Sequence, residues 1–196
     1  MQNYNSKLKI NKQEKLNKIA QEIENCDVCK IGKQGKPVPG EGNPDADVVF
    51  IGEAPGKKEA ETGRPFIGRS GQLLRSLIRG IGLDDEKDVY ITSPVKYLPN
   101  RSTPTSKDIA HGRFHLMRQF AVIKPKVVML LGRVAAEGVL ERKVAVASDH
   151  GQVIEEKEEI KYFLTFHPAA ALRFPKKYKS LLEEDFKKLK KLIAHE

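Results

Sequence analysis

A buried-strand sequence that runs directly into a glycine-rich loop is the feature that most constrains this chain. The apolar, β-branched run at residues 48–51 predicts the strand, and an apolar helical pattern resumes after residue 71. The residues that shape the loop between them are Gly52, Pro55, Gly56, Gly63, Pro65, Gly68 and Gly71. Glycine lets the backbone approach a ligand closely and proline fixes the loop, so this segment predicts a binding site.

Two familiar phosphate-binding loops do not match this segment. Three residues separate Gly52 from Gly56 and no Ser or Thr follows Lys57, so the nucleoside-triphosphate loop pattern is not met. The segment also lacks the G-x-G-x-x-G of a dinucleotide-binding loop. The loop therefore predicts a different ligand.

Strand-like and helix-like segments alternate along the rest of the chain. The predicted strands are 47–52, 88–95, 126–132 and 161–166, and the predicted helices are 5–25, 70–81, 106–122, 133–140 and 175–194. Between them, the polar stretch 143–160 suggests a β-hairpin that turns at 149–151. This order predicts one domain over residues 1–196, of class α/β, with three α/β/α layers and a central, mainly parallel, four-stranded sheet. The loops 53–71, 93–104 and 167–173 should then converge beyond the carboxyl ends of the strands.

The charge balance favours an anionic partner. The chain has 35 Lys and Arg against 26 Asp and Glu, a net charge of +9, which suits a nucleic acid but also serves solubility. With no Trp and five Tyr, a pocket is expected rather than an extended base-stacking platform. No apolar run is long enough to span a membrane, and the polar start of the chain lacks a secretory h-region. We therefore expect a cytoplasmic, nucleoid-associated protein with no membrane partner.

The two cysteines, Cys26 and Cys29, form a C-x-x-C motif after a predicted helix. Their spacing suits metal ligation, but a closed zinc or iron-sulfur site normally needs four ligands. A thioredoxin-like redox pair is a second interpretation, although no strand precedes the motif. Two leftover thiols of an ancestral site are the third.

Two motifs together resemble a known family. Gly52-Glu53-Ala54-Pro55-Gly56 is followed by Glu59, Gly63-Arg64-Pro65-Phe66, Gly68 and Ser70-Gly71, and His167-Pro168-Ala169-Ala170-Ala171-Leu172-Arg173 lies near the end. In this order they resemble the uracil-DNA glycosylase superfamily, specifically the family 4, iron-sulfur type of archaea and thermophilic bacteria. The resemblance spans the chain from about Cys26 to the C-terminal helix.

The resemblance implies a role for each residue of the first motif. Glu53 and Glu59 would be the catalytic carboxylates, and Phe66 would stack on a base rotated out of the duplex. The residues that would line the pocket and position the water or sugar are Gly52, Ala54, Pro55 and Gly56. Each assignment has a structural alternative: Glu53 could close a loop hydrogen bond, and Phe66 could belong to the core.

The second motif and the start of the helix near residue 70 would contact the base and DNA. His167 would donate a hydrogen bond to the uracil O2 as negative charge develops on the departing base, although it could also simply cap a strand. Leu172 would fill the gap left by the base, and Arg173 would contact a phosphate or the minor groove. The residues at the helix start that would meet the backbone phosphates are Arg69, Ser70 and Gly71. DNA with deaminated bases is the expected partner, a monomer suits base flipping, and recruitment by a sliding clamp is left open.

The chain departs from the family pattern at the uracil-binding asparagine, which is Ser93 here. A serine offers one hydroxyl in place of a bidentate amide, which weakens either uracil binding or its discrimination from cytosine.

The chain also departs at the second pair of cluster cysteines. These positions are Tyr97 and about Gly112, with His111 beside the latter. We therefore expect no complete four-iron four-sulfur cluster, even if His111 substitutes for one ligand. Packing of Tyr97 against the N-terminal helix would replace the cross-link and make the cysteines dispensable.

These observations predict a DNA repair glycosylase that hydrolyses the N-glycosidic bond of uracil, or another deaminated base, and leaves an abasic site. One alternative is a DNA-binding member with weak or no catalysis, motivated by Ser93 and the missing cysteines. The other is a glycosylase with specificity shifted toward hypoxanthine or xanthine, since a smaller side chain at position 93 enlarges the pocket.

Overall fold

A central sheet organises the computed structural model, which describes residues 2–101 and 103–194, with side chains from residue 11 onward. Within these residues the sheet has six strands in the order β2-β4-β3-β6-β8-β7. The four inner strands are parallel: β4 (Val89–Thr92), β3 (Val48–Ile51), β6 (Val127–Leu131) and β8 (Ile160–Thr165). They are the four strands predicted from the sequence. The α/β class with a mainly parallel central sheet is confirmed.

Two antiparallel edge strands extend the predicted four-stranded sheet. They are β2 (Glu41–Gly42), which pairs with β4, and β7 (Gln152–Lys157), which pairs with β8. β2 is only two residues long, and β7 is polar and carries a register shift between Val153 and Glu155. Neither has the apolar run that marks the inner strands. A separate two-stranded sheet joins β1 (Lys33–Gln34) to β5 (Leu98–Pro99).

The predicted hairpin at 149–151 is wrong in its position. Residues 146–149 form a short helix, α7 (Val146–Asp149), and the hairpin joins β7 to β8 instead. Glu158 and Glu159 make its turn, with φ of 53° and 63°. Two consecutive left-handed residues match the right-handed twist of a hairpin, but glutamates give no sequence signal for such a turn.

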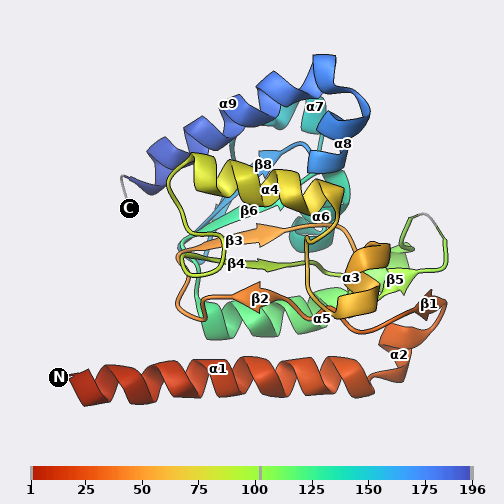
Figure 1. The fold of residues 1–196 in the computed structure, drawn as a ribbon, viewed down its shortest axis with the longest axis vertical. Helices are drawn as coiled ribbons and strands as arrows, with labels where there is room; N and C mark the ends of the chain where they lie inside the picture. The colour runs from red at the N-terminus through yellow and green to blue at the C-terminus, as the bar shows by residue number, and fades with distance from the viewer. Residues whose placement is uncertain (1, 102, 195–196) are drawn as a thin grey trace.

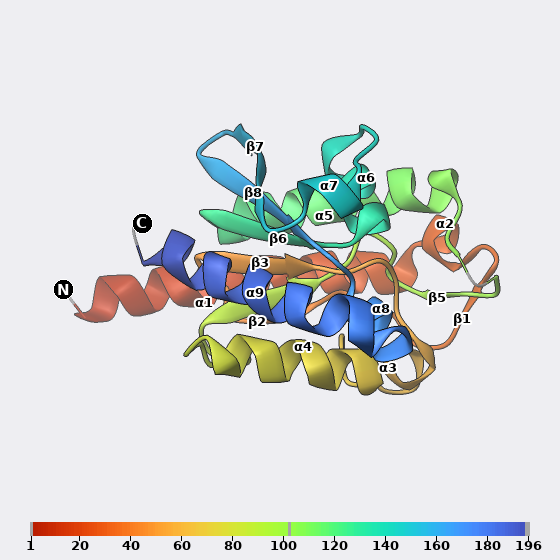
Figure 2. The ribbon, with the colours of Figure 1, turned by 90° about the horizontal axis from the view of Figure 1, so that it is seen from above.

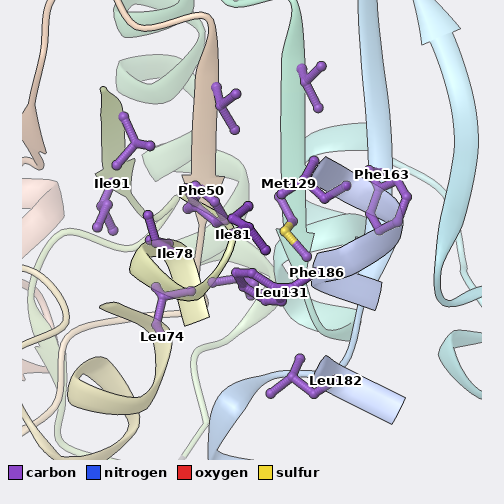
Figure 3. Packing of buried hydrophobic residues seen from close by; sticks show 14 of the residues in the cluster. Phe50, Leu74, Ile78, Ile81, Ile91, Met129, Leu131, Phe163, Leu182 and Phe186 are labelled. Atoms are coloured by element: carbon purple, nitrogen blue, oxygen red, sulfur yellow. The ribbon is translucent and has the colours of Figure 1, made fainter. Parts of the chain in front are cut away.

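Helices cover both faces of the sheet (Figure 2). One face packs against α4 (Arg69–Gly80) and α9 (Pro175–Ile193), and the other against α1 (Gln2–Asn25), α5 (Ser106–Ile123) and α6 (Arg133–Leu140). On the first face the rings of Phe50 and Phe186 stack with centroids 5.9 Å apart (Figure 3). On the second, Thr105 and Asp108 form the capping box that starts α5. Both faces are therefore buried by amphipathic helices.

The remaining short helices gather at one end of the sheet. They are α2 (Asp27–Lys30), α3 (Lys57–Thr62) and α8 (Pro168–Arg173). Figure 1 shows α3, β5 and α2 on the right, beyond the arrowheads of β3 and β4, while α1 begins and α9 ends on the left. The carboxyl ends of the parallel strands thus open into a cluster of loops. Among the described residues, no helix is both long enough and apolar enough to cross a membrane.

Candidate functional site

A cavity of about 520 Å³ lies beyond the carboxyl ends of the parallel strands. The three loops predicted to converge all line it. The first loop contributes residues at both of its ends, the second contributes Ser93 and Pro104, and the third contributes His167 and Ala169. The predicted site residues that the structure brings together here are Glu53, Ala54, Pro55, Gly56, Glu59, Phe66, Ser70, Ser93 and His167, whereas Gly52 does not line the cavity. Asn100 and Arg101 also line the cavity and were not predicted.

His167 is oriented by the helix that follows it. As the N-cap of α8, its Nδ1 accepts a hydrogen bond from the Ala169 backbone N–H at 3.1 Å. Burial lowers the pKa of His167 to about 4, so the imidazole is neutral at physiological pH. In a neutral imidazole whose Nδ1 accepts, Nε2 carries the proton. The cavity therefore has a fixed neutral N–H donor.

Phe66 occupies a tightly enclosed position next to His167. Its backbone has a φ of 51°, which a bulky residue rarely adopts, and its ring centroid lies 5.9 Å from that of His167. A Cβ at Gly52 would stand 2.5 Å from the Phe66 ring, and a Cβ at Gly71 would stand 2.0 Å from the Phe66 carbonyl. These two glycines thus make room for Phe66. Gly71 is buried beneath it rather than placed at the surface expected for a DNA contact.

Arg75, on α4, holds the loop that carries Phe66. Its guanidinium donates to the carbonyl oxygens of Phe66 at 3.0 Å and Pro65 at 3.1 Å. It also pairs with Asp85 at 2.9 Å and with Glu41. Arg75 was not predicted as a site residue, because a buried arginine within an amphipathic helix gives no pattern that distinguishes it from a surface charge.

The two candidate carboxylates differ in their surroundings. Glu59 Oε1 accepts hydrogen bonds from the backbone N–H groups of Ile67 at 2.9 Å and Gly68 at 2.7 Å. Glu53 lines the same cavity, and burial raises the pKa of its carboxyl against the opposing charge of Arg133. Glu59 therefore closes the loop, whereas Glu53 presents a partly desolvated acid to the cavity.

Ser93 is buried at the end of β4, and its hydroxyl donates to the Val95 carbonyl at 2.8 Å. This bond uses the only proton of the hydroxyl, so the side chain can offer the cavity only acceptor lone pairs. An amide in its place would present both a donor and an acceptor.

A shallow, basic groove adjoins the cavity. Lys57, Glu59, Ser70 and Ala169 line both, so the two hollows are continuous at these residues. The basic and apolar side chains that the groove adds are Lys58, Arg69, Leu172 and Arg173. Leu172 is 39% exposed, an apolar side chain at the surface beside the cavity mouth. The structure thus places four of the five predicted DNA-contact residues along one groove: Arg69, Ser70, Leu172 and Arg173.

A second constellation lies beside the N-terminal helix, apart from the cavity. Cys26, Cys29, His111 and His115 each offer a ligand atom, and these atoms all lie within 4.8 Å of one another. His111 was considered as a ligand from the sequence, whereas His115 was not, although the two have i, i+4 spacing on a predicted helix. This Cys/His cluster can hold a metal ion.

The donor set does not fit a four-iron four-sulfur cluster. Such a cluster takes one ligand on each of four separate iron atoms, usually four thiolates, so its ligand atoms stand around a bulky core. Here two ligands are imidazoles, and Cys26 Sγ lies only 3.1 Å from His111 Nε2. Tyr97 packs against Ile19 and Ile23, as expected for a residue that replaces a cluster ligand. A Cβ at Gly112 would stand 1.8 Å from the Pro94 carbonyl oxygen, which leaves no room for a cysteine there.

Comparisons with known proteins agree with this arrangement. The model of the Uracil DNA glycosylase superfamily matches residues 39–191. A type-4 uracil-DNA glycosylase of Sulfurisphaera tokodaii is 39% identical over 187 residues, which cover 90% of this chain and 84% of that protein. One of Archaeoglobus fulgidus is 37% identical over 190 residues, covering 92% and 94%, and one of Thermotoga maritima is 36% identical over 182 residues, covering 91% and 94%. The chain therefore belongs to the uracil-DNA glycosylase superfamily, and within it to the type-4 family.

Proposed function

We propose that this chain is a DNA repair glycosylase that hydrolyses the N-glycosidic bond of uracil in DNA and leaves an abasic site. The observation that carries the proposal is one cavity lined by an aromatic ring, a fixed N–H donor and a partly desolvated carboxylate, all at the carboxyl ends of parallel strands. We propose that residues 1–196 act as a single domain, since the helices on both faces pack on one sheet.

Phe66 and Ser93 would hold the flipped base. The base would stack on the Phe66 ring, whose position Gly52 and Arg75 enforce. Ser93 Oγ, already a donor to Val95, would accept a hydrogen bond from the uracil N3–H. Stacking is sequence-tolerant, so selection of the base falls to the polar contacts.

His167 would stabilise the leaving group. When the bond between N1 and C1′ breaks, the electron pair leaves with the base and negative charge accumulates on O2. The Nε2–H of a neutral imidazole, held in place by the Ala169 N–H, can donate to that oxygen without losing its own proton. A preorganised donor of this kind stabilises a transition state by about 3 kcal/mol.

Glu53 would act on the sugar side of the broken bond. Its carboxylate would favour the positive charge that develops on the deoxyribose and orient the water whose oxygen bonds to C1′. Water supplies the hydroxyl at C1′, and its proton balances the departing base anion. Glu59 accepts hydrogen bonds from two backbone N–H groups, and we infer that it holds the loop in shape. Its predicted catalytic role stays a prediction.

The basic groove would carry the DNA strand past the cavity. Lys57, Lys58 and Arg69 would contact phosphates, and Arg173 would contact a phosphate or the minor groove. Leu172, exposed between them, would enter the space vacated by the base. A monomeric state and recruitment by a sliding clamp stay predictions.

A second candidate function has one specific observation in its favour. The Ser93 hydroxyl already donates its proton to the Val95 carbonyl, so toward a base it acts only as an acceptor. It can then accept equally from the N3–H of uracil and from the N1–H of hypoxanthine or xanthine. A glycosylase of broader deaminated-base specificity is therefore the alternative to strict uracil selection.

A panel of oligonucleotide duplexes tests both functions. Each duplex carries one uracil, hypoxanthine, xanthine or cytosine, and the products are scored as free base and as alkali-labile abasic site. We expect release of uracil and no release of cytosine. Release of hypoxanthine at a similar rate would select the second candidate. Salt-sensitive binding of the duplex without release of any base would contradict glycosylase function.

A further inference from the structure

The Cys/His cluster is a site that the proposed glycosylase chemistry does not use. It lies between α2 and α5, away from the cavity, and its four residues belong to two motifs far apart in the sequence. We propose that Cys26, Cys29, His111 and His115 bind one zinc-like divalent cation in tetrahedral geometry, where the family resemblance implies an iron-sulfur cluster. The proposal is independent of the reaction at the cavity.

The spacing of the four ligands matches that of a structural zinc site. Cys26 and Cys29 form C-x2-C, and His111 and His115 form H-x3-H on α5. Structural Cys2His2 zinc sites use this pattern, with two to four residues between the cysteines and three to five between the histidines. Cys26 precedes the short α2 and Cys29 lies within it, so one turn of chain brings both thiols to the same side.

The distances between the four ligand atoms suit one shared ion. Zinc bonds of about 2.3 Å to sulfur and about 2.0 Å to nitrogen place the four ligand atoms of a tetrahedron roughly 3.3–3.8 Å apart. The ligand atoms here lie within 4.8 Å of one another, and Cys26 Sγ and His111 Nε2 are 3.1 Å apart. Closing the set around one ion requires shifts of about 1 Å.

His115 also supports a metal site, because its buried ring is otherwise unsatisfied. The side chain is 4% exposed, and neither Nδ1 nor Nε2 has a hydrogen-bond partner in the part of the chain described. A buried polar group without a partner destabilises the folded state, so native structures rarely keep one unless it binds something. The rings of His111 and Phe114 pack edge-on against it and fix its orientation. A metal ion would satisfy one of the two nitrogens.

The charge of the donor set suits a divalent ion. Two thiolates and a divalent cation sum to zero, so the loaded site can be buried at little electrostatic cost.

A two-iron centre with two cysteines and two histidines is the nearest rival. In such a centre both thiolates bind one iron and both imidazoles bind the other, so the two pairs stand apart. Here a cysteine and a histidine are close to each other instead, with Cys26 Sγ 3.1 Å from His111 Nε2. This arrangement favours a single ion that all four ligands share.

Metal analysis of the full chain tests the proposal. The protein is expressed with iron and zinc both supplied, purified under reducing conditions, and assayed for bound metals and acid-labile sulfide. The expected result is about one zinc per chain and no sulfide. Iron accompanied by acid-labile sulfide, or a visible brown absorbance, would overturn the proposal.

Cobalt titration of the metal-stripped protein gives a second, spectroscopic readout. We expect one equivalent of Co²⁺ to produce the intense visible bands of a tetrahedral thiolate site, which zinc then removes. Cys26→Ser and His115→Asn should weaken cobalt binding by at least about 100-fold, because even second-shell changes cost 10–100-fold. Val28→Ser, between the cysteines and half-exposed, is the matched control and should bind as the wild type does.

Stability provides a readout that does not depend on the spectrum. Zinc should raise the melting temperature of the wild type and of Val28→Ser, and leave that of Cys26→Ser unchanged. Wild-type protein that takes up neither zinc nor cobalt would contradict the proposal, whatever the variants do. So would equal cobalt affinity in Cys26→Ser and Val28→Ser.

Discussion

The Phe66 ring and the His167 imidazole lie with their centroids 5.9 Å apart and their planes tilted by 31°. One comes from the glycine-rich loop after β3 and the other from the N-cap of α8, and both line the same cavity. The pair places a stacking surface beside a hydrogen-bond donor. This is the arrangement that a flipped pyrimidine needs, since one group binds its face and the other its edge.

Removal of the Phe66 ring should weaken binding of the base. Stacking of a base on an aromatic side chain contributes about 1–3 kcal/mol, so Phe66→Ala should raise the half-saturating enzyme concentration roughly 5- to 150-fold. Single-turnover release of uracil over a range of enzyme concentrations measures this. Phe114→Ala, which removes an exposed phenylalanine outside the cavity, is the control and should behave as the wild type does. Equal half-saturation for the two variants would contradict stacking on Phe66.

A methyl group at Gly52 should displace the same ring without removing it. The new Cβ would stand 2.5 Å from the Phe66 ring, so Gly52→Ala should lower the free energy of unfolding by about 1–3 kcal/mol and weaken base binding as well. Gly80→Ala is the control: a Cβ there meets nothing within 4 Å, and it should stabilise the helix by about 0.5–1 kcal/mol. Denaturant unfolding measures the free energy of unfolding of both variants. An unchanged free energy of unfolding in Gly52→Ala would show that the Phe66 ring moves freely.

Arg75 should matter for both folding and activity, although it touches no substrate. Arg75→Leu leaves Asp85 and Glu41 without their buried partner, which should cost about 3–5 kcal/mol. Arg79→Ala removes a partly exposed ion pair to the same Asp85 and should cost at most about 1 kcal/mol. Because Arg75 fixes the Phe66 carbonyl, Arg75→Lys should raise half-saturation for uracil DNA more than it lowers the maximal rate. A change in maximal rate alone would argue against this positioning role.

The pH dependence of the chemical step should follow Glu53 and not His167. Burial raises the pKa of Glu53 above 4.5, and the carboxylate is the active form, so the rate should fall as the pH drops through that raised pKa. Burial holds the pKa of His167 at about 4, so this residue stays neutral in that range and gives no inflection near 6.5. Single-turnover rates across pH should show one acid limb, absent in Glu53→Gln. An inflection near 6.5 that disappears in His167→Ala would contradict the assignment.

Restoring the amide at position 93 should sharpen the choice of base. Ser93→Asn adds a donor for the uracil O4 while keeping an acceptor for N3–H, and a paired hydrogen bond of this kind discriminates strongly between bases. We expect uracil release to rise at least about tenfold while cytosine is still not released, because the N4 amine and unprotonated N3 of cytosine oppose the amide N–H and C=O. Hypoxanthine presents the same C=O and N–H edge as uracil and should gain as well. Ser93→Ala, which removes the acceptor, is the matched comparison and should lower uracil release. Unchanged uracil release in Ser93→Asn would place base recognition elsewhere.

The sequence predicted the inner sheet and the cavity because their signals are local. The apolar runs of β3, β4, β6 and β8 are continuous, and parallel strands direct their carboxyl ends to one edge. The loops after three of those strands then had to meet, as Glu53, Ser93 and His167 do. The edge strands were missed because β2 is two residues long and β7 is largely polar.

What the sequence could not supply were contacts between distant segments. His115 belongs to the Cys/His cluster only because α5 packs beside α2. No local sequence pattern predicts this packing. Arg75 supports Phe66 only because α4 packs against the loop and brings the guanidinium to the Phe66 carbonyl oxygen. The turn at Glu158 and Glu159 was missed because two glutamates with positive φ contradict the usual turn composition.

Single-turnover release of uracil from a duplex with uracil opposite guanine, by wild type and by His167→Ala, tests the proposed glycosylase activity most directly. His150→Asn, which keeps a side-chain N–H toward Asp185 outside the cavity, is the matched control. We expect release by the wild type, a loss of about 10²–10³-fold in His167→Ala and no loss in His150→Asn. A wild type that binds the duplex without releasing uracil, or a His167→Ala variant that keeps the full rate, would contradict it.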